Sequence, residues 1–242
     1  MELEGKVAIV TGGAVRLGKA QALALAEAGA RVLIHYGSSE GPAQETVAEI
    51  EDLGSEAVAI QGDFRNVSGV RSMMEDAVEA FGQIDILVNS AAIFEAKGWQ
   101  DTTEGIWDRH FAINLKAPFF LSQAFAKHVG EDRRGHIVNI ADWRGVRPGT
   151  DHFAYTLTKA GLIAMTKSLA LGMAPTIQVN AIAPGFILPP PAAGEGFKED
   201  KVKQVPIGRR GYPSDITETL LFLLRSDFVT GELVFVTGGE HL

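Results

Sequence analysis

The sequence predicts an α/β protein with a doubly wound parallel sheet in a single domain. Short apolar and β-branched runs alternate with amphipathic stretches along nearly the whole chain, and a glycine turn follows the first run. Strands that alternate with helices pair in parallel, because each helix carries the chain back across the sheet. The 242 residues can form one large core, and no linker, repeat or low-complexity tract divides them. We therefore expect one domain over residues 1–242.

The first half of the chain predicts a βαβαβ unit that continues into a further helix and strand. Val7–Val10 is an apolar run typical of a buried strand, and the Ala/Leu-rich stretch up to Gly29 has the period of a helix. The same alternation follows, with strands expected at 31–36, 57–61 and 84–88 and helices at 42–52 and 70–81. Helices connected in this way cover both faces of a parallel sheet.

The second half repeats the pattern and contains one irregular segment. Helices are expected at 114–128, 153–173 and 215–224, and strands at 136–140, 177–182 and 233–236. The Pro- and Gly-rich interval 184–196 interrupts this alternation. A segment of that length in a compact domain is more often a functional lid than a domain boundary. We therefore expect a substrate loop at about 185–210.

Composition excludes several classes of function. The 22 Lys and Arg residues stand against 30 Asp and Glu residues, and the formal charge of -8 would not attract nucleic acid or an anionic membrane. The lack of cysteine removes thiolate catalysis, disulfides and Cys-bound metals. His128, His136 and His152 lack metal-ligand spacing. No secretory leader or apolar run of about 18 residues occurs. We expect a cytoplasmic protein that acts on a small molecule.

A glycine turn between the first strand and the first helix indicates a nucleotide site. Gly12, Gly13 and Gly18 allow the main chain to approach a pyrophosphate, and the helix N-terminus presents N–H groups and its positive dipole end. Arg16 and Leu17 lie inside the same turn. Such turns also occur in α/β proteins that bind no nucleotide, so this segment alone leaves both interpretations open.

The residues after the second strand favour NADP over NAD. An NAD-selective site usually has Asp or Glu there to bind the ribose 2′-hydroxyl. The chain instead runs His35-Tyr36-Gly37-Ser38-Ser39, in which no carboxylate would repel a 2′-phosphate and several groups could donate to it. An ordinary polar loop is the alternative. Asp63, after the third strand, is either an acceptor for the adenine amino group or a loop or helix-capping acid.

A tyrosine and a lysine four residues apart indicate proton-transfer chemistry. Tyr155 and Lys159 fall on one face of a predicted helix, within reach of one ligand. A neighbouring ammonium stabilises a phenolate, and so lowers the phenol pKa from its usual value near 10. Such a pair can serve as a general acid or base near neutral pH.

Together the motifs resemble the short-chain dehydrogenase/reductase family. Five segments carry the likeness across essentially the whole chain: Thr11-Gly12 with Gly18, Asn89-Ser-Ala-Ala92, Asn114, Tyr155-Thr-Leu-Thr-Lys159 and Pro184-Gly185. The resemblance implies a Rossmann fold and hydride transfer between a nicotinamide and a substrate. It also implies that Tyr155 is the acid or base, that Lys159 lowers its pKa and holds the nicotinamide ribose, and that a homotetramer packs through the helices near Asn114 and Tyr155.

The same resemblance implies roles for further residues. Asn114 would support a water of the proton relay, or else be a structural residue at a helix kink. Asn89–Ala92 would pack beside the cofactor, and Pro184–Ile187 would meet the nicotinamide carboxamide. NADP(H) is the expected cofactor, and no metal is expected. The expected cofactor contacts are Gly12, Arg16, Leu17, Gly18, His35, Tyr36, Ser38, Ser39, Asp63, Phe64, Asn89, Ser90, Ala91, Pro184, Gly185 and Ile187.

Departures from the general family pattern are similar to its pteridine reductase branch. Arg16 replaces the middle glycine of the turn, and Asp142 stands in the place of the catalytic serine, 13 residues before Tyr155. Phe94 and the pair His35-Tyr36 also resemble that branch. Phe94 could stack on a pterin, and Arg16 could bridge a cofactor phosphate and a substrate carbonyl. The alternatives are a core aromatic for Phe94 and a solvated first-turn residue for Arg16.

A carboxylate beside the phenol favours reduction. Asp142 would repel a Tyr155 phenolate and accept the hydroxyl hydrogen, so the phenol stays protonated against the pull of Lys159. A protonated phenol can donate a proton to the reduced substrate. A strand-end cap is the alternative role for Asp142. The predicted catalytic residues are Asp142, Tyr155, Lys159 and Asn114, and the predicted substrate contacts are Arg16, Phe94, Asp142 and Tyr155.

The sequence thus predicts an NADPH-dependent reductase of a dihydropterin- or dihydrofolate-like substrate. A reductase of 3-ketoacyl thioesters, sugars or other carbonyl compounds is the enzymatic alternative. A protein that binds the dinucleotide as a sensor, without catalysis, is a third hypothesis. The intact Asn114, Tyr155 and Lys159 count against the sensor, because a sensor does not need a positioned acid.

Overall fold

A parallel sheet of seven strands is the centre of the structure, a computed structural model that describes residues 1–189 and 200–242. The strand order is β3-β2-β1-β4-β5-β6-β7. Strand order reverses between β1 and β4, and open α/β sheets bind ligands at the carboxyl ends of strands at such a switch point. The strands are β1 (Val7–Thr11), β2 (Arg31–Tyr36), β3 (Ala57–Gln61), β4 (Ile86–Asn89), β5 (Gly135–Ile140), β6 (Ile177–Pro184) and β7 (Leu233–Val236).

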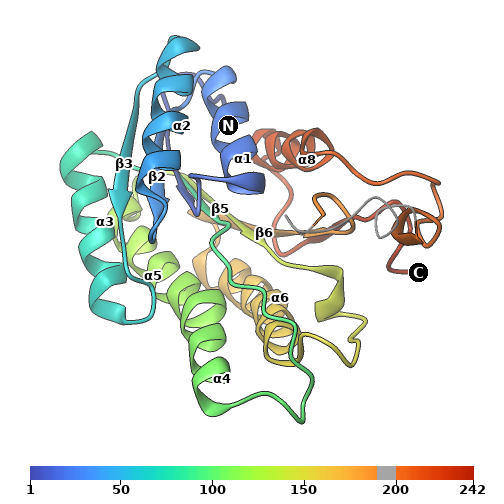
Figure 1. The fold of residues 1–242 in the computed structure, drawn as a ribbon. Coiled ribbons are helices and arrows are strands. Elements are labelled where there is room, and N and C mark those ends of the chain that lie inside the picture. Colours follow the sequence, from blue (N-terminus) through green and yellow to red (C-terminus); the bar gives the residue numbers. More distant parts are fainter. Residues whose placement is uncertain (190–199) are drawn as a thin grey trace.

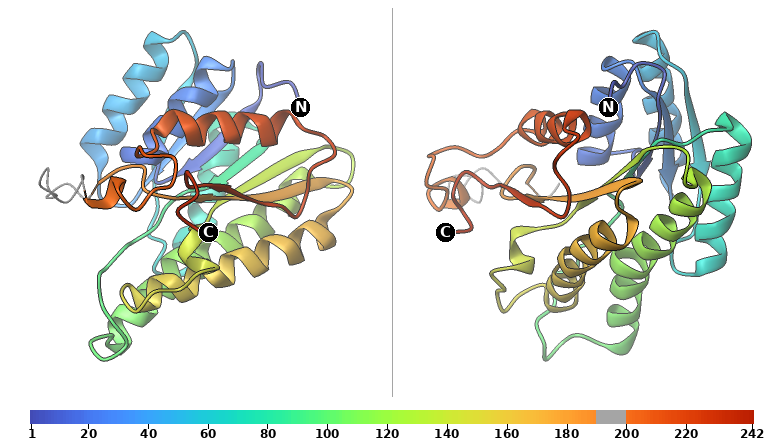
Figure 2. Two further views of the ribbon diagram at one scale, coloured as in Figure 1. Left: turned by 90° about the vertical axis from the view of Figure 1, so that its right-hand side faces the viewer. Right: turned by 180° about the vertical axis from the view of Figure 1, so that it is seen from behind.

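Helices cover both faces of this sheet (Figure 1). The main helices are α1 (Arg16–Glu27), α2 (Glu40–Asp52), α3 (Val67–Phe81), α4 (Glu104–Phe111), α5 (Ala117–Val129), α6 (Phe153–Met173) and α8 (Pro213–Arg225). One core cluster joins α1, α2 and α8 to the sheet, and the other joins α3, α5 and α6 to its opposite face. Figure 2 shows the two layers from the side and from behind. Among the described helices, none is long and apolar enough to cross a membrane.

Strand β1 shows why the apolar runs are continuous rather than alternating. Val7 and Ile9 pack into the core on the side of α3 and α5, whereas Ala8 and Val10 pack into the core on the side of α1 and α8. All four residues are 0% exposed. A strand that is covered on both faces needs apolar side chains at every position.

The structure confirms the predicted fold class and corrects the region before residue 117. A single helix over 114–128 is wrong at its N-terminal end: α4 comes first, and Ala112–Lys116 is a π-helical turn that leads into α5. Helix α4 has no clear apolar period in the sequence, because it is rich in charged and aromatic residues. The residue that it buries is His110, which is polar. Thr103, whose Oγ1 accepts from Ile106 N at 3.3 Å, is the capping signal that marks its start.

Candidate active site

Tyr155 and Asp142 meet at the carboxyl end of β5. Asp142 follows β5, and its Oδ1 accepts a hydrogen bond from Arg144 N at 2.8 Å, which caps the short 3₁₀ turn Trp143–Gly145. Tyr155 lies in the first turn of α6, and its hydroxyl donates to Asp142 Oδ2 at 2.8 Å. Burial and the Asp142 charge raise the pKa of Tyr155 well above its usual value of 10. The phenol therefore carries its proton at neutral pH.

Lys159 lies one turn further along α6 and is 3% exposed. Its Nζ donates to Ile140 O at 2.6 Å and lies 5.5 Å from the centroid of the Tyr155 ring. Burial lowers the pKa of Lys159 to about 8, against the raising effect of the Asp142 charge. The lowering of the Tyr155 pKa expected from Lys159 is not found: burial and then Asp142 raise that pKa, and the opposing charge is that of Arg144.

Asn114 lies in the π turn and holds the chain that follows β4. Its Nδ2 donates to Ile93 O at 2.9 Å, and its Oδ1 accepts from Ile93 N at 2.9 Å. Both polar atoms of the Asn114 amide thus form hydrogen bonds with the main chain of Ile93. This geometry matches the structural alternative for Asn114, a residue at a helix irregularity, and π turns of this kind frequently occur at functional sites.

The glycine turn after β1 is closely packed and has the geometry of an anion cradle. A Cβ at Gly18 would overlap the carbonyl oxygen of Gly12, and a Cβ at Gly12, where φ is 66°, would lie 2.9 Å from Ala91 Cα. No described side chain caps the start of α1, where Val15 is the N-cap. The open N–H groups of the first turn fit the pyrophosphate of a dinucleotide.

Thr11 connects this turn to the end of β4, a role that the sequence analysis missed. Its Oγ1 accepts from Ser90 N at 2.9 Å and from Ala91 N at 3.0 Å. Asn89, which was expected to contact the cofactor, is buried and donates from Nδ2 to Asn139 Oδ1 at 2.8 Å. The segment that begins at Asn89 is therefore held from both sides, by β1 and by β5.

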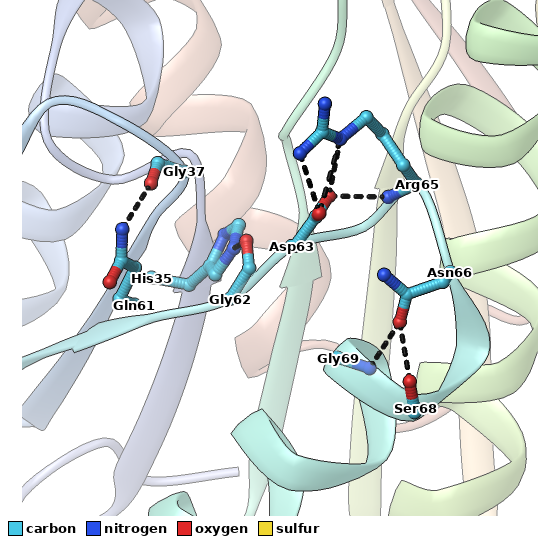
Figure 3. A network of polar contacts seen from close by, with 9 residues as sticks. All are labelled: His35, Gly37, Gln61, Gly62, Asp63, Arg65, Asn66, Ser68 and Gly69. Atoms are coloured by element: carbon cyan, nitrogen blue, oxygen red, sulfur yellow. Dashed lines mark hydrogen bonds and ion pairs between the residues drawn. The ribbon is translucent and has the colours of Figure 1, made fainter.

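His35 does not have the predicted role. Its ring is 3% exposed and stacks on Phe64 at 3.8 Å between centroids. Nδ1 accepts from Gly12 N at 3.2 Å, so the proton is on Nε2, which lies 3.0 Å from Gly62 O (Figure 3). Burial lowers its pKa to about 4. A neutral ring with both nitrogens engaged cannot donate to a 2′-phosphate, and Phe64 supports the ring beneath the glycine turn.

Polar groups remain available at the carboxyl ends of β2 and β3. Ser38 is exposed and Ser39 half-buried, whereas Tyr36 is 9% exposed. Figure 3 shows the guanidinium of Arg65 folded over the Asp63 carboxylate, with Nη2 to Oδ2 at 2.8 Å. The hydrogen bonds from Arg65 lower the pKa of Asp63. An adenine amino group at Asp63 would therefore share a carboxylate that is already ion-paired.

Arg16 links the glycine turn to the segment after β6. It adopts φ 54°, and its Nη2 donates to Leu188 O at 3.3 Å and Pro189 O at 3.1 Å. Leu17 is half-buried at the base of the same turn. The segment itself is tightly placed, because a Cβ at Gly185 would lie 2.7 Å from Thr237 Cα. Ile187 is 5% exposed, and residues 190–199 of the expected substrate loop lie outside the described residues.

Phe94 is a surface aromatic beside the phenol. It is 51% exposed, and its ring forms a T-shaped contact with the Tyr155 ring at 4.6 Å between centroids. The core alternative for Phe94 is therefore wrong. One face of the ring stacks on His152 at 3.9 Å. The sequence carries no local signal for His152 as a neighbour of the site, because His152 has a left-handed conformation, φ 52°, at the start of α6.

Known proteins match this chain over almost its whole length. A family model described as enoyl-(acyl carrier protein) reductase matches residues 13–241. The (2S)-[(R)-hydroxy(phenyl)methyl]succinyl-CoA dehydrogenase subunit BbsD of Thauera aromatica is 37% identical over 249 residues, with 100% of this chain and 99% of the relative covered. The chain belongs to the short-chain dehydrogenase/reductase family. It is an NAD(P)-dependent oxidoreductase.

Two further members of the short-chain dehydrogenase/reductase family represent different chemistries. The 3-oxoacyl-[acyl-carrier-protein] reductase FabG of Staphylococcus aureus is 35% identical over 242 residues, with 98% of each chain covered. The crystal structure of FolM alternative dihydrofolate reductase 1 from Brucella canis, complexed with NADP, is 34% identical with a TM-score of 0.94. That comparison covers 99% of this chain and 95% of the FolM chain.

The glycine turn of this short-chain dehydrogenase/reductase gives a first prediction. Gly18→Ala is expected to lower the free energy of unfolding by about 1–3 kcal/mol and to weaken NADPH binding, because the new Cβ would overlap Gly12. Urea denaturation and NADPH fluorescence titration measure the two effects. Gly41→Ala in α2 is the control, since its Cβ would meet no atom within 4 Å. Equal stability of the two variants would contradict the close approach of the turn.

Proposed function

We propose that the protein is an NADPH-dependent reductase of a dihydropterin- or dihydrofolate-like substrate. The chemistry that bound NADPH supplies is a hydride for a carbon of the pteridine ring. Tyr155 donates its hydroxyl proton to the adjacent ring nitrogen, so that a C=N bond becomes CH–NH. The observation that carries the proposal is the 2.8 Å hydrogen bond from the Tyr155 hydroxyl to Asp142. It keeps the phenol protonated, which suits donation rather than alcohol oxidation.

Nearby cations stabilise the charge that proton donation leaves behind. A Tyr155 phenolate beside the Asp142 carboxylate is unfavourable, because like charges repel. Arg144 opposes this effect, since its charge lowers the pKa of Tyr155. The Lys159 ammonium also lies near the phenol, with its Nζ 5.5 Å from the centroid of the Tyr155 ring. The Arg144 charge thus makes proton donation by Tyr155 easier.

Arg16 and Phe94 are proposed to hold the flat substrate. Phe94 offers an exposed aromatic surface next to the proton donor, and ring stacking suits a planar pteridine. The Arg16 guanidinium lies between the glycine turn and the segment after β6, where its remaining donors can reach a phosphate and a ring carbonyl together. The substrate would then lie between the nicotinamide and the Phe94 ring.

The cofactor preference gives a second prediction. The enzyme is expected to bind NADPH more tightly than NADH, because β2 ends without a carboxylate and is followed by Ser38 and Ser39. Ser38→Asp is expected to weaken NADPH binding by about tenfold or more and to spare NADH, since a carboxylate repels a 2′-phosphate. Fluorescence titrations give the Kd of each dinucleotide. Ser38→Asn is the uncharged control, and an unchanged NADPH-to-NADH ratio in Ser38→Asp would contradict the assignment.

A 3-ketoacyl-thioester reductase is the second candidate function. It is favoured by the 35% identity to the 3-oxoacyl-[acyl-carrier-protein] reductase FabG of S. aureus. NADPH oxidation by the purified enzyme with dihydrobiopterin, dihydrofolate and acetoacetyl-CoA separates the two functions. Pterin turnover at a kcat/KM above that for acetoacetyl-CoA is expected. Turnover of acetoacetyl-CoA with neither pterin would overturn the proposed function and favour the second candidate.

We also propose a homotetramer that packs through α5 and α6. Phe119 on α5 is 38% exposed and Leu157 on α6 is 37% exposed, so both helices present apolar side chains at the surface. Large apolar side chains gathered on exposed helix faces are typical of subunit interfaces.

A further inference from the structure

A hollow of about 520 Å³ opens beside Asp142, and it shares only Arg144 with the proton transfer described above. Three separate segments form it: the turn after β5, the residues before α8 and the end of the chain. Its volume is in the range of small-molecule sites. The lining residues are Trp143, Arg144, Arg147, Lys201, Gln204, Pro206, Gly239, Glu240 and Leu242.

Cationic side chains dominate this hollow, although the chain as a whole carries a formal charge of -8. Arg144 is held in place by Asp151, with Nη1 to Oδ1 at 2.8 Å. Within the described residues, Arg147 and Lys201 line the hollow without an ion pair of their own. Two unpaired cations next to a held guanidinium favour an anionic ligand.

Among the described lining residues, the acidic side chain is Glu240, and it has a structural role. Glu240 Oε2 accepts a hydrogen bond from Phe186 N at 2.8 Å, which fixes the carboxylate to the segment after β6. The charges of Lys201, Asp142 and Arg144 all act on the pKa of Glu240, although burial has the largest effect and raises it. Trp143 and Arg144, which directly follow Asp142 in the chain, line the hollow, so it lies close to the partner of the proton donor.

The walls also offer an aromatic surface. Trp143 directly follows Asp142 in the chain, and the Arg144 guanidinium lies 5.5 Å from the centroid of the Trp143 ring. Pro206 adds apolar surface from another segment. A ligand group that joins a flat ring to carboxylates would match this combination, since the ring can stack on Trp143 and the carboxylates can pair with Arg147 and Lys201.

We propose that this hollow binds the anionic tail of the substrate, and that the tail is the p-aminobenzoyl-glutamate group of a dihydrofolate. The inference rests on the proposed function, because it names the substrate within the pteridine class. Arg147 and Lys201 are then specificity residues, which distinguish a dihydrofolate from a dihydropterin that carries no acid.

The first test compares two substrates of the holoenzyme at saturating NADPH. Arg147→Gln is expected to raise the ratio of KM for dihydrofolate to KM for dihydrobiopterin by about tenfold, because one charge-assisted hydrogen bond is lost for one substrate only. Lys201→Gln is expected to act in the same direction. Arg225→Gln, which removes an exposed arginine at the end of α8, is the matched control. An unchanged ratio in both lining variants would overturn the subsite.

The second test does not depend on turnover. Calorimetry with p-aminobenzoyl-L-glutamate is expected to show binding to the wild-type enzyme loaded with NADPH, and about tenfold weaker binding to Arg147→Gln. If neither pterin is reduced but the fragment binds in this way, the proposed function fails and the anionic subsite stands. If both pterins are reduced and the fragment binds equally to wild type and variant, the subsite fails and the proposed function stands.

A third arm identifies the source of the anion. Coenzyme A also carries negative groups, in its phosphates, so acetoacetyl-CoA is assayed with the same variants. If Arg147→Gln raises KM for acetoacetyl-CoA about tenfold and leaves the dihydrofolate ratio unchanged, the hollow serves a phosphate and the dihydrofolate assignment is overturned. The expected result is the reverse.

Discussion

Tyr155→Phe is expected to lower kcat for dihydropterin reduction by about 10²–10⁴-fold, the usual contribution of a positioned general acid. The variant keeps the ring and its edge contact with Phe94 but loses the hydroxyl that donates to Asp142 at 2.8 Å. Because the ring is retained, NADPH binding and the free energy of unfolding are expected to change little. Steady-state NADPH oxidation, NADPH titration and urea denaturation measure the three quantities.

A matched control removes a phenol hydroxyl elsewhere. Tyr212 is half-exposed at the start of α8, outside the proton-transfer set. Tyr212→Phe is therefore expected to retain wild-type kcat. If Tyr155→Phe turned over dihydropterin as fast as Tyr212→Phe, Tyr155 would not be the proton donor. A dinucleotide sensor without catalysis would then again be a hypothesis to consider, because a positioned proton donor is the main argument against it.

The sheet could be predicted because its strands are short apolar runs covered on both faces. Val7–Val10 is fully buried between two helical layers, and the expected strand at 31–36 and helix at 153–173 agree with the observed bounds. The glycine turn after the first strand could also be predicted locally, because a Cβ at Gly18 would overlap Gly12, only six residues earlier in the chain. Signals of this kind are local in sequence, so one chain is enough to detect them.

Other features depend on contacts that are distant in sequence. His35 is polar and lies at the end of β2, so it was expected to face the ligand, but Phe64 and Gly62 enclose it. The π turn at Ala112–Lys116 contains Asn114, which binds the main chain of Ile93, and helical periodicity reveals neither feature. The hollow beside Asp142 joins three segments that are far apart along the chain. No spacing rule would have brought these groups together.

Asp142 itself could be anticipated only through the family pattern. Its position after β5 is local, whereas its pairing with a phenol on α6 is tertiary. The resemblance supplied that pairing by placing Asp142 where the family has a serine. The geometry adds what the pattern lacked: the same carboxylate caps the turn to Arg144, so its orientation is fixed before any substrate arrives.

Asp142→Asn is expected to move the alkaline limb of the kcat profile for pterin reduction to lower pH. Protonated phenol is the active form, so activity falls as pH rises through its pKa. The Asp142 charge raises the pKa of Tyr155 and also that of Lys159, which titrates at about 8. Removing the charge lowers both pKa values, so both groups lose their protons at lower pH. The two effects have the same sign.

The substitution also weakens the hydrogen bond that orients the phenol, and kcat at pH 7 is expected to fall by about tenfold or more. The wild-type Tyr155 limb lies above pH 10, so profiles of kcat from pH 5 to 10 measure the limb set by Lys159, together with the rate. Asp151→Asn is the matched control, because it removes a carboxylate that binds Arg144 and His152 in the same region without touching the Tyr155 hydroxyl. We expect the alkaline limb to shift in Asp142→Asn but not in Asp151→Asn. This result would show that the limb depends on Asp142 as the partner of the phenol, and not on the loss of any nearby negative charge. If both variants kept the wild-type limb and rate, Asp142 would be only a cap for the turn, and the preference for reduction would need another cause.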